Sequence, residues 1–201
     1  MILYDDNEIV VCIKEKGVLS QQGKPGQRSM IDILSAQYGC EIYPVHRLDK
    51  EVSGVMVYAK TKAAAANLSA QVSEREMEKH YMATTSVMLS EEEGTMEDLL
   101  YFDKSKNKSF VVKKERRGVK KAILEYKFFK SEEGMATYKV RLLTGRTHQV
   151  RVQFASRKAP LVGDRKYGSQ INCDIGLVSC FLAFRHPKTG EWLEFKHPDY
   201  K

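Results

Sequence analysis

The sequence predicts an α+β fold built on a largely antiparallel sheet. Segments of strand character follow one another along most of the chain, and only a few segments have the composition of a helix. Of the 201 residues, 42% are hydrophobic, which is enough to form a substantial core. Because no repeat or Pro/Gly-rich linker interrupts the chain, we expect one domain over residues 1–201.

Strand and helix candidates alternate in the first half of the chain. Residues 8–12 (EIVVC) have the pattern of a short strand, and the turn sequence GKPG at 23–26 precedes a helical segment at 29–38. The apolar residues 53–58 (SGVMVY) predict a buried strand. Residues 61–77 contain an alanine run and predict a helix, because alanine loses little side-chain entropy there.

The second half is dominated by strand patterns. Further strands are predicted at residues 81–88, 122–129 and 137–143, followed by a hairpin of 177–185 and 191–196 around the turn HPKTG. In the strand at 137–143, Lys139 and Arg141 alternate with Tyr138, Val140 and Leu142. This period of two places the cations outward and the apolar side chains inward.

The positive charge of the chain is concentrated in one segment. The formal net charge is +7, and residues 104–121 (KSKNKSFVVKKERRGVKK) contain nine Lys or Arg and one acid, Glu115. Such a run is either a solvated basic loop or a contact for a polyanion, and charge alone does not choose between them. Phe110, Val111 and Val112 within the run favour an ordered strand.

Several functional classes are disfavoured by missing patterns. The chain has neither the apolar run of a membrane span nor the N-terminal pattern of a signal peptide, so we expect a cytoplasmic protein. Phosphate-binding and dinucleotide-binding glycine motifs are absent, and no cofactor is expected. The histidines and cysteines lack zinc-ligand spacing, so no metal is expected. Four cysteines without a CxxC pair are expected to be reduced, buried thiols: Cys12, Cys40, Cys173 and Cys180.

Four charged or glycine-flanked stretches are poorly explained by core packing. They are HRLDKEVSG at residues 46–54, EKHYMA at 78–83, TGRTHQVR at 144–151 and PLVGDRKYG at 160–168. Taken singly, an Asp in a loop is usually a turn residue, and a Tyr at the start of a strand usually belongs to the core or an interface. Their occurrence together calls for a functional explanation.

In order and spacing, these stretches resemble the RluA-type pseudouridine synthases, which isomerise uridine in RNA to its C-glycoside. The resemblance extends from ILYDDNEIVV at the N-terminus to LAFRHPKTGEWLEFKHP near the C-terminus. It departs from the family at KEKG (14–17), where Lys-Pro-x-Gly is frequent, and at Val52, where Thr is frequent. No N-terminal RNA-binding domain of the S4 type is expected before Ile9, so RNA targeting would depend on the catalytic domain.

The resemblance implies the catalytic residues. Through the HRLD motif, Asp49 would act at the sugar, either as a nucleophile or by removing a sugar proton. Arg151 would pair with this carboxylate and keep it ionised. Tyr81 would stack on the flipped uracil and is a candidate acid or base for the C5 proton.

The resemblance also implies how RNA is bound. Arg47 would occupy the space vacated by the flipped base, and the alternative for this residue is a surface ion pair with Asp49 or Glu51. The basic segment would follow the RNA backbone. The remaining residues predicted to bind substrate are His46, Arg146, His148, Lys113, Lys114, Arg116 and Arg117.

The segment at residues 149–155 gives conflicting signals. Its polar and apolar residues alternate, which by periodicity alone predicts a strand. The resembled family has a helix at this position, and we therefore expect a helix, with Thr147 as the candidate N-cap.

Two functions from different classes are compatible with these observations. The first is a monomeric RNA pseudouridine synthase that acts on ribosomal or transfer RNA. The second is a non-catalytic RNA-binding or ribosome-assembly protein on the same scaffold. Retention of Asp49, Tyr81 and Arg151 favours the enzyme.

Overall fold

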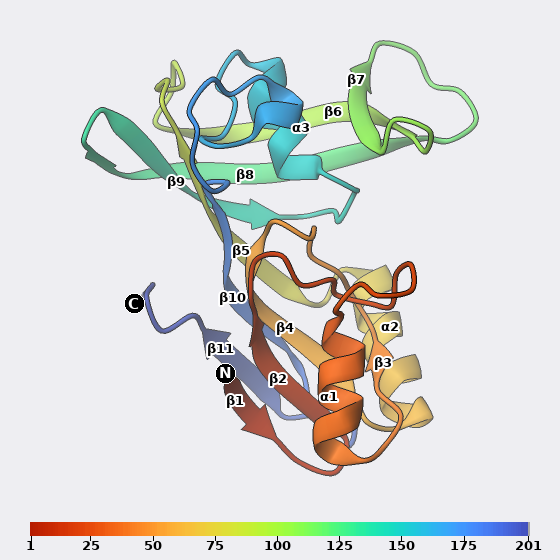
Figure 1. Cartoon of the computed structure of the whole chain (residues 1–201). Coiled ribbons are helices and arrows are strands. Elements are labelled where there is room, and N and C mark those ends of the chain that lie inside the picture. Colours follow the sequence, from red (N-terminus) through yellow and green to blue (C-terminus); the bar gives the residue numbers. More distant parts are fainter. Residues whose placement is uncertain (201) are drawn as a thin grey trace. The chain divides into compact units, whose positions relative to one another are not determined.

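The computed structural model describes residues 1–200, and the chain divides into two units, drawn in Figure 1. Unit 1 contains Met1–Lys79 together with the chain from Ser179 onward, and unit 2 contains His80–Val178. The two boundaries fall near one end of β5 (Glu78–Thr85) and of β10 (Leu177–Arg185), and each of these strands is described with the unit that contains most of it. The single domain over residues 1–201 stays a prediction.

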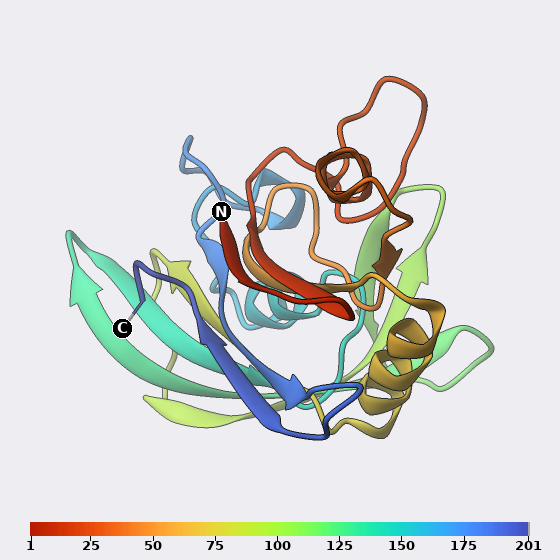
Figure 2. The ribbon, with the colours of Figure 1, turned by 90° about the horizontal axis from the view of Figure 1, so that it is seen from below.

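Unit 1 combines strands from both ends of the chain. Its elements are β1 (Ile2–Asp5), β2 (Ile9–Lys14), α1 (Met30–Tyr38), β3 (Tyr43–Pro44), β4 (Ser53–Ala59), α2 (Lys62–Glu74), β10 (Leu177–Arg185) and β11 (Trp192–Lys196). The strands are ordered β1-β2-β4-β10, with β11 paired to β10 and β3 to β4. Figure 2 shows the N-terminal and C-terminal hairpins of this sheet in red and blue.

Both helices of unit 1 begin at a side-chain cap. The Ser29 hydroxyl accepts a hydrogen bond from the Asp32 amide at 3.2 Å, and Thr61 does the same for Ala64 at 3.1 Å. Such caps satisfy amides that have no partner within the helix. At the other end of α1, Gly39 adopts φ of 64°, a left-handed conformation that glycine tolerates without a Cβ penalty. The predicted helices at 29–38 and 61–77 are confirmed, although α2 ends at Glu74.

The core of unit 1 lies where β2 and β4 pair. Alternate residues of both strands are buried on one face, including Val11 and Val57, and they pack with Leu68 of α2 and Phe184 of β10. At Gly54, φ is 131° and the backbone of Ser179 lies within 3 Å of where a Cβ would stand. Only glycine allows this close approach.

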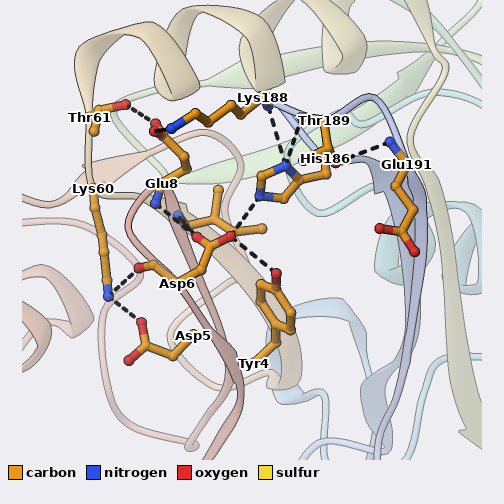
Figure 3. A network of polar contacts seen from close by, with 11 residues as sticks. Tyr4, Asp5, Asp6, Glu8, Lys60, Thr61, His186, Lys188, Thr189 and Glu191 are labelled. Carbon is orange, nitrogen blue, oxygen red and sulfur yellow. Dashed lines mark hydrogen bonds and ion pairs between the residues drawn. The ribbon is translucent and has the colours of Figure 1, made fainter.

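A polar network joins the two ends of the chain within unit 1, as Figure 3 shows. The Asp6 carboxylate accepts hydrogen bonds from the amides of Glu8 and Ile9, both at 2.8 Å, and from the Tyr4 hydroxyl at 3.1 Å. It also contacts Nε2 of the buried His186 at 2.8 Å. We call these groups, together with the adjoining ion pairs Asp5–Lys60 and Glu8–Lys188, the Asp6–His186 network.

Unit 2 is an antiparallel sheet covered by one short helix. Its elements are β5 (Glu78–Thr85), β6 (Glu93–Asp103), β7 (Lys108–Val112), β8 (Val119–Glu132), β9 (Met135–Leu142), α3 (Gln149–Ser156) and a 3-10 turn (Arg165–Tyr167). The strands are ordered β5-β9-β8-β6-β7, and all four pairings are antiparallel. In β9, Tyr138 and Val140 are buried while Lys139 and Arg141 are exposed, which confirms the predicted alternation.

The segment after the TGRT loop is helical. The family resemblance predicted this helix, whereas the alternation of polar and apolar residues predicted a strand. Helix α3 packs Val152 and Ala155 against Leu100 and Ala122 of the sheet. Its expected cap is wrong, because His148, with φ of 54°, occupies the N-cap position and makes no side-chain cap bond. The Gln149 side chain organises this loop instead, and its Oε1 accepts hydrogen bonds from the Arg146 amide and the Thr144 hydroxyl.

The α+β class is confirmed, with some differences in detail. β1, β3 and β6 were not predicted, and the basic segment contains β7 and the first residues of β8. Cys12 and Cys180 are buried as expected, whereas the prediction of burial is wrong for the exposed Cys40 and Cys173. Within residues 1–200, no helix is long and apolar enough to span a bilayer.

Candidate active site

The loop that carries Asp49 is held on both sides by buried polar groups of unit 1. The Ser20 hydroxyl donates to the Leu48 carbonyl at 2.8 Å and accepts from the Leu48 amide at 2.9 Å. On the far side of Asp49, the Val52 amide donates to the Asp49 carbonyl at 3.1 Å and closes a turn. The half-buried Asp49 side chain therefore projects from a constrained backbone.

Lys14 is the second support of this loop, and its sequence context did not single it out. Its side chain is fully buried, and Nζ donates to the carbonyls of Val18 at 2.8 Å, Glu15 at 3.0 Å and Lys50 at 3.2 Å. Burial lowers the pKa of Lys14 to about 8, and the charges of Glu51 and Asp49 oppose the decrease. A buried cation satisfied by three carbonyls thus lies beside the candidate catalytic loop.

His46 holds the start of the same loop. Its Nε2 accepts a hydrogen bond from the Val57 amide of β4 at 3.1 Å. Burial, and secondarily the charge of Lys79, lowers the pKa of His46 to about 3. A neutral imidazole is required here because Nε2 must keep its lone pair to accept the bond.

Arg47 differs from its neighbours because it is exposed. The backbone on either side is fixed through His46 and Leu48, so the intervening side chain extends to solvent. Within residues 1–200 Arg47 makes no ion pair, so the alternative of a surface pair with Asp49 or Glu51 is not observed. A guanidinium in this situation can engage an incoming nucleic acid.

Arg151 lies in unit 2 in a bidentate ion pair with Asp164, a residue that no sequence motif marked as its partner. Nε donates to one carboxylate oxygen at 2.7 Å and Nη2 to the other at 2.8 Å. Both side chains are at most 5% exposed. A guanidinium has five N–H donors, and the ion pair with Asp164 uses two of them. The ion pair also fixes the plane of the guanidinium and so the directions of its three remaining N–H groups. The pairing of Arg151 with Asp49 stays a prediction.

Tyr81 is a buried residue of β5, with a side chain only 7% exposed. Its register partner is Val140 of β9, and the flanking pairs are His80 with Arg141 and Met82 with Lys139. The phenol is therefore carried by a strand that is hydrogen-bonded to β9, which limits its movement.

His148 is directed into unit 2. Its Nδ1 lies 2.9 Å from the Tyr167 hydroxyl, and its ring is perpendicular to that of Phe102. The Tyr167 hydroxyl accepts from the Ser109 amide and donates to the Ser109 carbonyl. These bonds join α3, the 165–167 turn and β7. The geometry gives His148 a supporting role, and contact with substrate stays a prediction.

The basic side chains of unit 2 fall into two groups. Lys113 and Lys114 are exposed in the connection between β7 and β8, and Arg116 lies over the Tyr101 ring, 4.7 Å from its centroid. Arg117 and Arg146 instead line one pocket of about 680 Å³. The structure thus brings residues distant in sequence, Arg117 and Arg146, to one place.

A family comparison decides the identity of the fold and its chemistry. Residues 8–156 match the family model described as RNA pseudouridylate synthase. The chain belongs to this family. It is an RNA pseudouridine synthase, an isomerase, and the matched region contains Asp49, Tyr81 and Arg151.

Individual relatives agree with the family. The chain is 34% identical to the dual-specificity RNA pseudouridine synthase RluA of Pasteurella multocida, over 98% of this chain and 92% of that one. It is 32% identical to ribosomal large subunit pseudouridine synthase D of Xylella fastidiosa, over 98% of this chain and 62% of that one. The structure of human RNA pseudouridylate synthase domain containing 4 superimposes with a TM-score of 0.80 at 23% identity, over 98% and 87% of the two chains, and shows the same fold.

The sequence analysis did not identify two supporting residues, Lys14 and Asp164, although both lie within segments that it quoted. Lys14 opens the KEKG segment and follows a continuous apolar run, which is an unusual place for an exposed lysine. Asp164 lies in PLVGDRKYG between a glycine and two cations. Neither motif indicates its partner, because Lys50 and Arg151 are distant in sequence.

Proposed function

We propose that the enzyme isomerises specific uridines in ribosomal or transfer RNA with Asp49 as the group that acts at the sugar. The position of Asp49 supports this role. It projects from a loop that Ser20, Lys14 and His46 hold in place, and preorganisation of a reacting group lowers the barrier to reaction.

The chemistry assigns a separate task to each residue. The N1–C1′ bond breaks, the free base turns, C1′ joins C5, the C5 proton leaves and N1 is protonated, so the atoms of uridine are conserved. Asp49 attacks C1′ as a nucleophile or removes a sugar proton. Arg151 stabilises this carboxylate, and the bidentate bond to Asp164 supports the role by setting its orientation.

Access to the sugar requires the nucleotide to leave its stack. Unstacking costs a few kcal/mol, which a side chain in the vacated space offsets. Arg47 is proposed for that position, because it is exposed and makes no ion pair within residues 1–200. Tyr81 is proposed to stack on the flipped uracil, with its hydroxyl as a candidate acid or base at C5.

The partners of the enzyme follow from the same proposal. RNA is the substrate, and the basic segment 104–121 contacts its backbone. A ribosomal target is supported by the name of the Xylella fastidiosa relative. We further propose a monomer that acts in the cytoplasm without a cofactor or a metal.

The decisive experiment compares Asp49→Asn with the parent for pseudouridine formed in bulk uridine-labelled RNA. We expect activity from the parent alone. Glu51→Gln is the matched control, because it removes an exposed carboxylate from the same loop and is expected to retain activity. Equal pseudouridine formation by the parent and Asp49→Asn would reject the proposed role of Asp49.

Tyr81→Phe separates the two roles of the phenol. The variant keeps the ring for stacking and lacks the hydroxyl. If the hydroxyl transfers the C5 proton, the single-turnover rate falls by about 10²-fold or more at saturating RNA. An unchanged rate would leave stacking as the role of Tyr81.

A further inference from the structure

A pocket of about 680 Å³ lies within unit 2, on the β6–β7 hairpin labelled in Figure 1. It is bounded by this hairpin, the start of β8 and the loop at residues 145–147. We call it the hairpin pocket. This volume falls in the range of about 300–1,000 Å³ that is typical of small-molecule sites. The pocket is therefore larger than a single inorganic anion requires.

Positive charge dominates the lining of the hairpin pocket. Four cations line it, Lys104, Arg117, Lys120 and Arg146, against one carboxylate, Asp103. Within residues 1–200 none of the four makes an ion pair.

The single carboxylate of the pocket offsets only one of these four positive charges. Asp103 accepts hydrogen bonds from the hydroxyl and amide of Ser105 and from the Lys106 amide. These bonds, led by the Ser105 side chain, lower the pKa of Asp103. The Asp103 carboxylate is therefore held by the turn at residues 103–106. The excess of positive charge in the lining favours an anionic ligand.

The pocket also contains an aromatic ring. Phe102 is half-buried and pairs in register with Ser109, so it shares a sheet face with Leu100 two residues earlier. Its ring is perpendicular to the buried His148, with 6.2 Å between centroids. An aromatic surface beside uncompensated cations matches a base and its phosphate better than a phosphate alone.

The walls of the hairpin pocket are fixed before any ligand binds. The Ser109 hydroxyl donates to the Thr147 carbonyl at 2.6 Å and joins β7 to the loop. The Arg146 amide donates to Gln149 Oε1, and Arg146 Nε donates to the Lys121 carbonyl, both at 2.9 Å. Because these groups are already ordered, binding loses less conformational entropy.

We propose that the hairpin pocket binds one unpaired nucleotide of the RNA substrate, with its phosphate against Arg117, Lys120 and Arg146 and its base on Phe102. This proposal rests on the proposed function, since it concerns the same RNA. A nucleotide within a duplex keeps its base stacked on its neighbours, so only a single-stranded segment can use both features.

The test measures binding of a labelled single-stranded oligouridylate as a function of salt. All variants are made in Asp49→Asn, so that turnover does not alter the RNA. We expect Phe102→Leu to weaken binding on the order of tenfold with an unchanged salt slope, because stacking releases no counterions. Arg117→Gln with Lys120→Gln should lower the slope by about one for each phosphate that the variant no longer neutralises.

Matched controls separate the pocket from general effects. Phe102→Tyr keeps the ring and should bind like the parent. Phe129→Leu removes an exposed ring elsewhere in unit 2, and Arg28→Gln removes an exposed guanidinium of unit 1. Both should leave affinity and slope unchanged.

The outcomes distinguish this proposal from the proposed function. If Phe102→Leu binds as tightly as the parent, or loses no more affinity than Phe129→Leu, the nucleotide pocket is overturned. An equal loss of affinity for inorganic polyphosphate would also overturn it, because no base would be involved. Pseudouridine formation by the Asp49 parent is measured separately, and its absence would reject the enzymatic function while leaving the binding result intact.

Discussion

The Asp6–His186 network and the hairpin pocket are both rich in charged groups. They differ in whether these groups have charged or hydrogen-bonding partners within the same unit. In the network, Asp5 pairs with Lys60, Glu8 pairs with Lys188 and Asp6 meets His186, all within unit 1, as Figure 3 shows. In the pocket, four cations have no carboxylate partner among residues 1–200.

This difference separates a structural site from a binding site. Charges that find partners inside a unit are used to hold the chain together, and their removal costs stability. Charges left over on a rigid surface are available to an external polyanion, and their removal costs affinity. The same residue types therefore have opposite experimental signatures.

The largest effect is expected for Lys14→Met, which removes a buried cation that three carbonyls of unit 1 satisfy. The carbonyls of Val18 and Lys50 lose a donor in a buried position, so we expect a loss of about 2–3 kcal/mol in the free energy of unfolding. Because Lys50 follows Asp49, pseudouridine formation should fall as well. Urea unfolding and single-turnover assays measure the two effects, and normal values of both would contradict the supporting role.

Lys14 should also leave a signature at high pH. Burial holds its folded pKa at about 8, below the ordinary value of 10.5, so between these limits the unfolded chain binds more protons. Stability therefore rises with pH through this interval. In Lys14→Met, the free energy of unfolding should rise less steeply with pH. The part of the rise that is due to Lys79, whose pKa is also lowered to about 8, should remain. An identical pH dependence in the variant and the parent would reject this assignment.

A smaller effect is expected in the Asp6–His186 network. Asp6→Ala removes an acceptor of four hydrogen bonds and should destabilise the protein by about 2 kcal/mol. In a double-mutant cycle with His186→Ala, we expect a coupling energy of at least about 0.5 kcal/mol. RNA affinity and its salt slope should be unchanged in Asp6→Ala. A decrease in either would show that the network also contributes to RNA binding.

The network should weaken in acid. Burial of Asp6 raises the pKa of its carboxyl, but the amides of Ile9 and Glu8 more than offset this, and the folded pKa lies below the ordinary value of 3.8. Asp6 therefore contributes stability above the unfolded pKa, and this contribution disappears as pH falls through the folded pKa. Urea unfolding should show a smaller acid-induced loss in Asp6→Ala than in the parent. Parallel curves would show that Asp6 does not contribute to acid sensitivity.

The smallest effect on stability is expected for Lys113→Gln with Lys114→Gln. Both side chains are exposed between β7 and β8, so the free energy of unfolding should change by less than about 0.5 kcal/mol. The salt slope of RNA binding should decrease by about one for each lysine that neutralises a phosphate in the parent. An unchanged slope would identify this part of the basic segment as a solvated face.

Local sequence patterns predicted elements whose signals lie within a few residues. The helices that follow Ser29 and Thr61, the alternation in β9 and the turn after His186 all depend on near neighbours. The pattern misled at residues 149–155, where packing of α3 on β6 and β8 overrode the alternation. At the candidate site, the motifs supplied Asp49, Tyr81 and Arg151 but not the groups that hold them.

The sequence by itself determined the α+β class, the family and the position of the candidate catalytic carboxylate, because each is encoded in short motifs or in periodicity. Only the tertiary structure decided that Arg151 is held by Asp164, that Lys14 satisfies the carbonyl of Lys50 and that Arg117 and Arg146 share a pocket. These pairs depend on strand register and loop closure, which bring together residues that no local pattern connects.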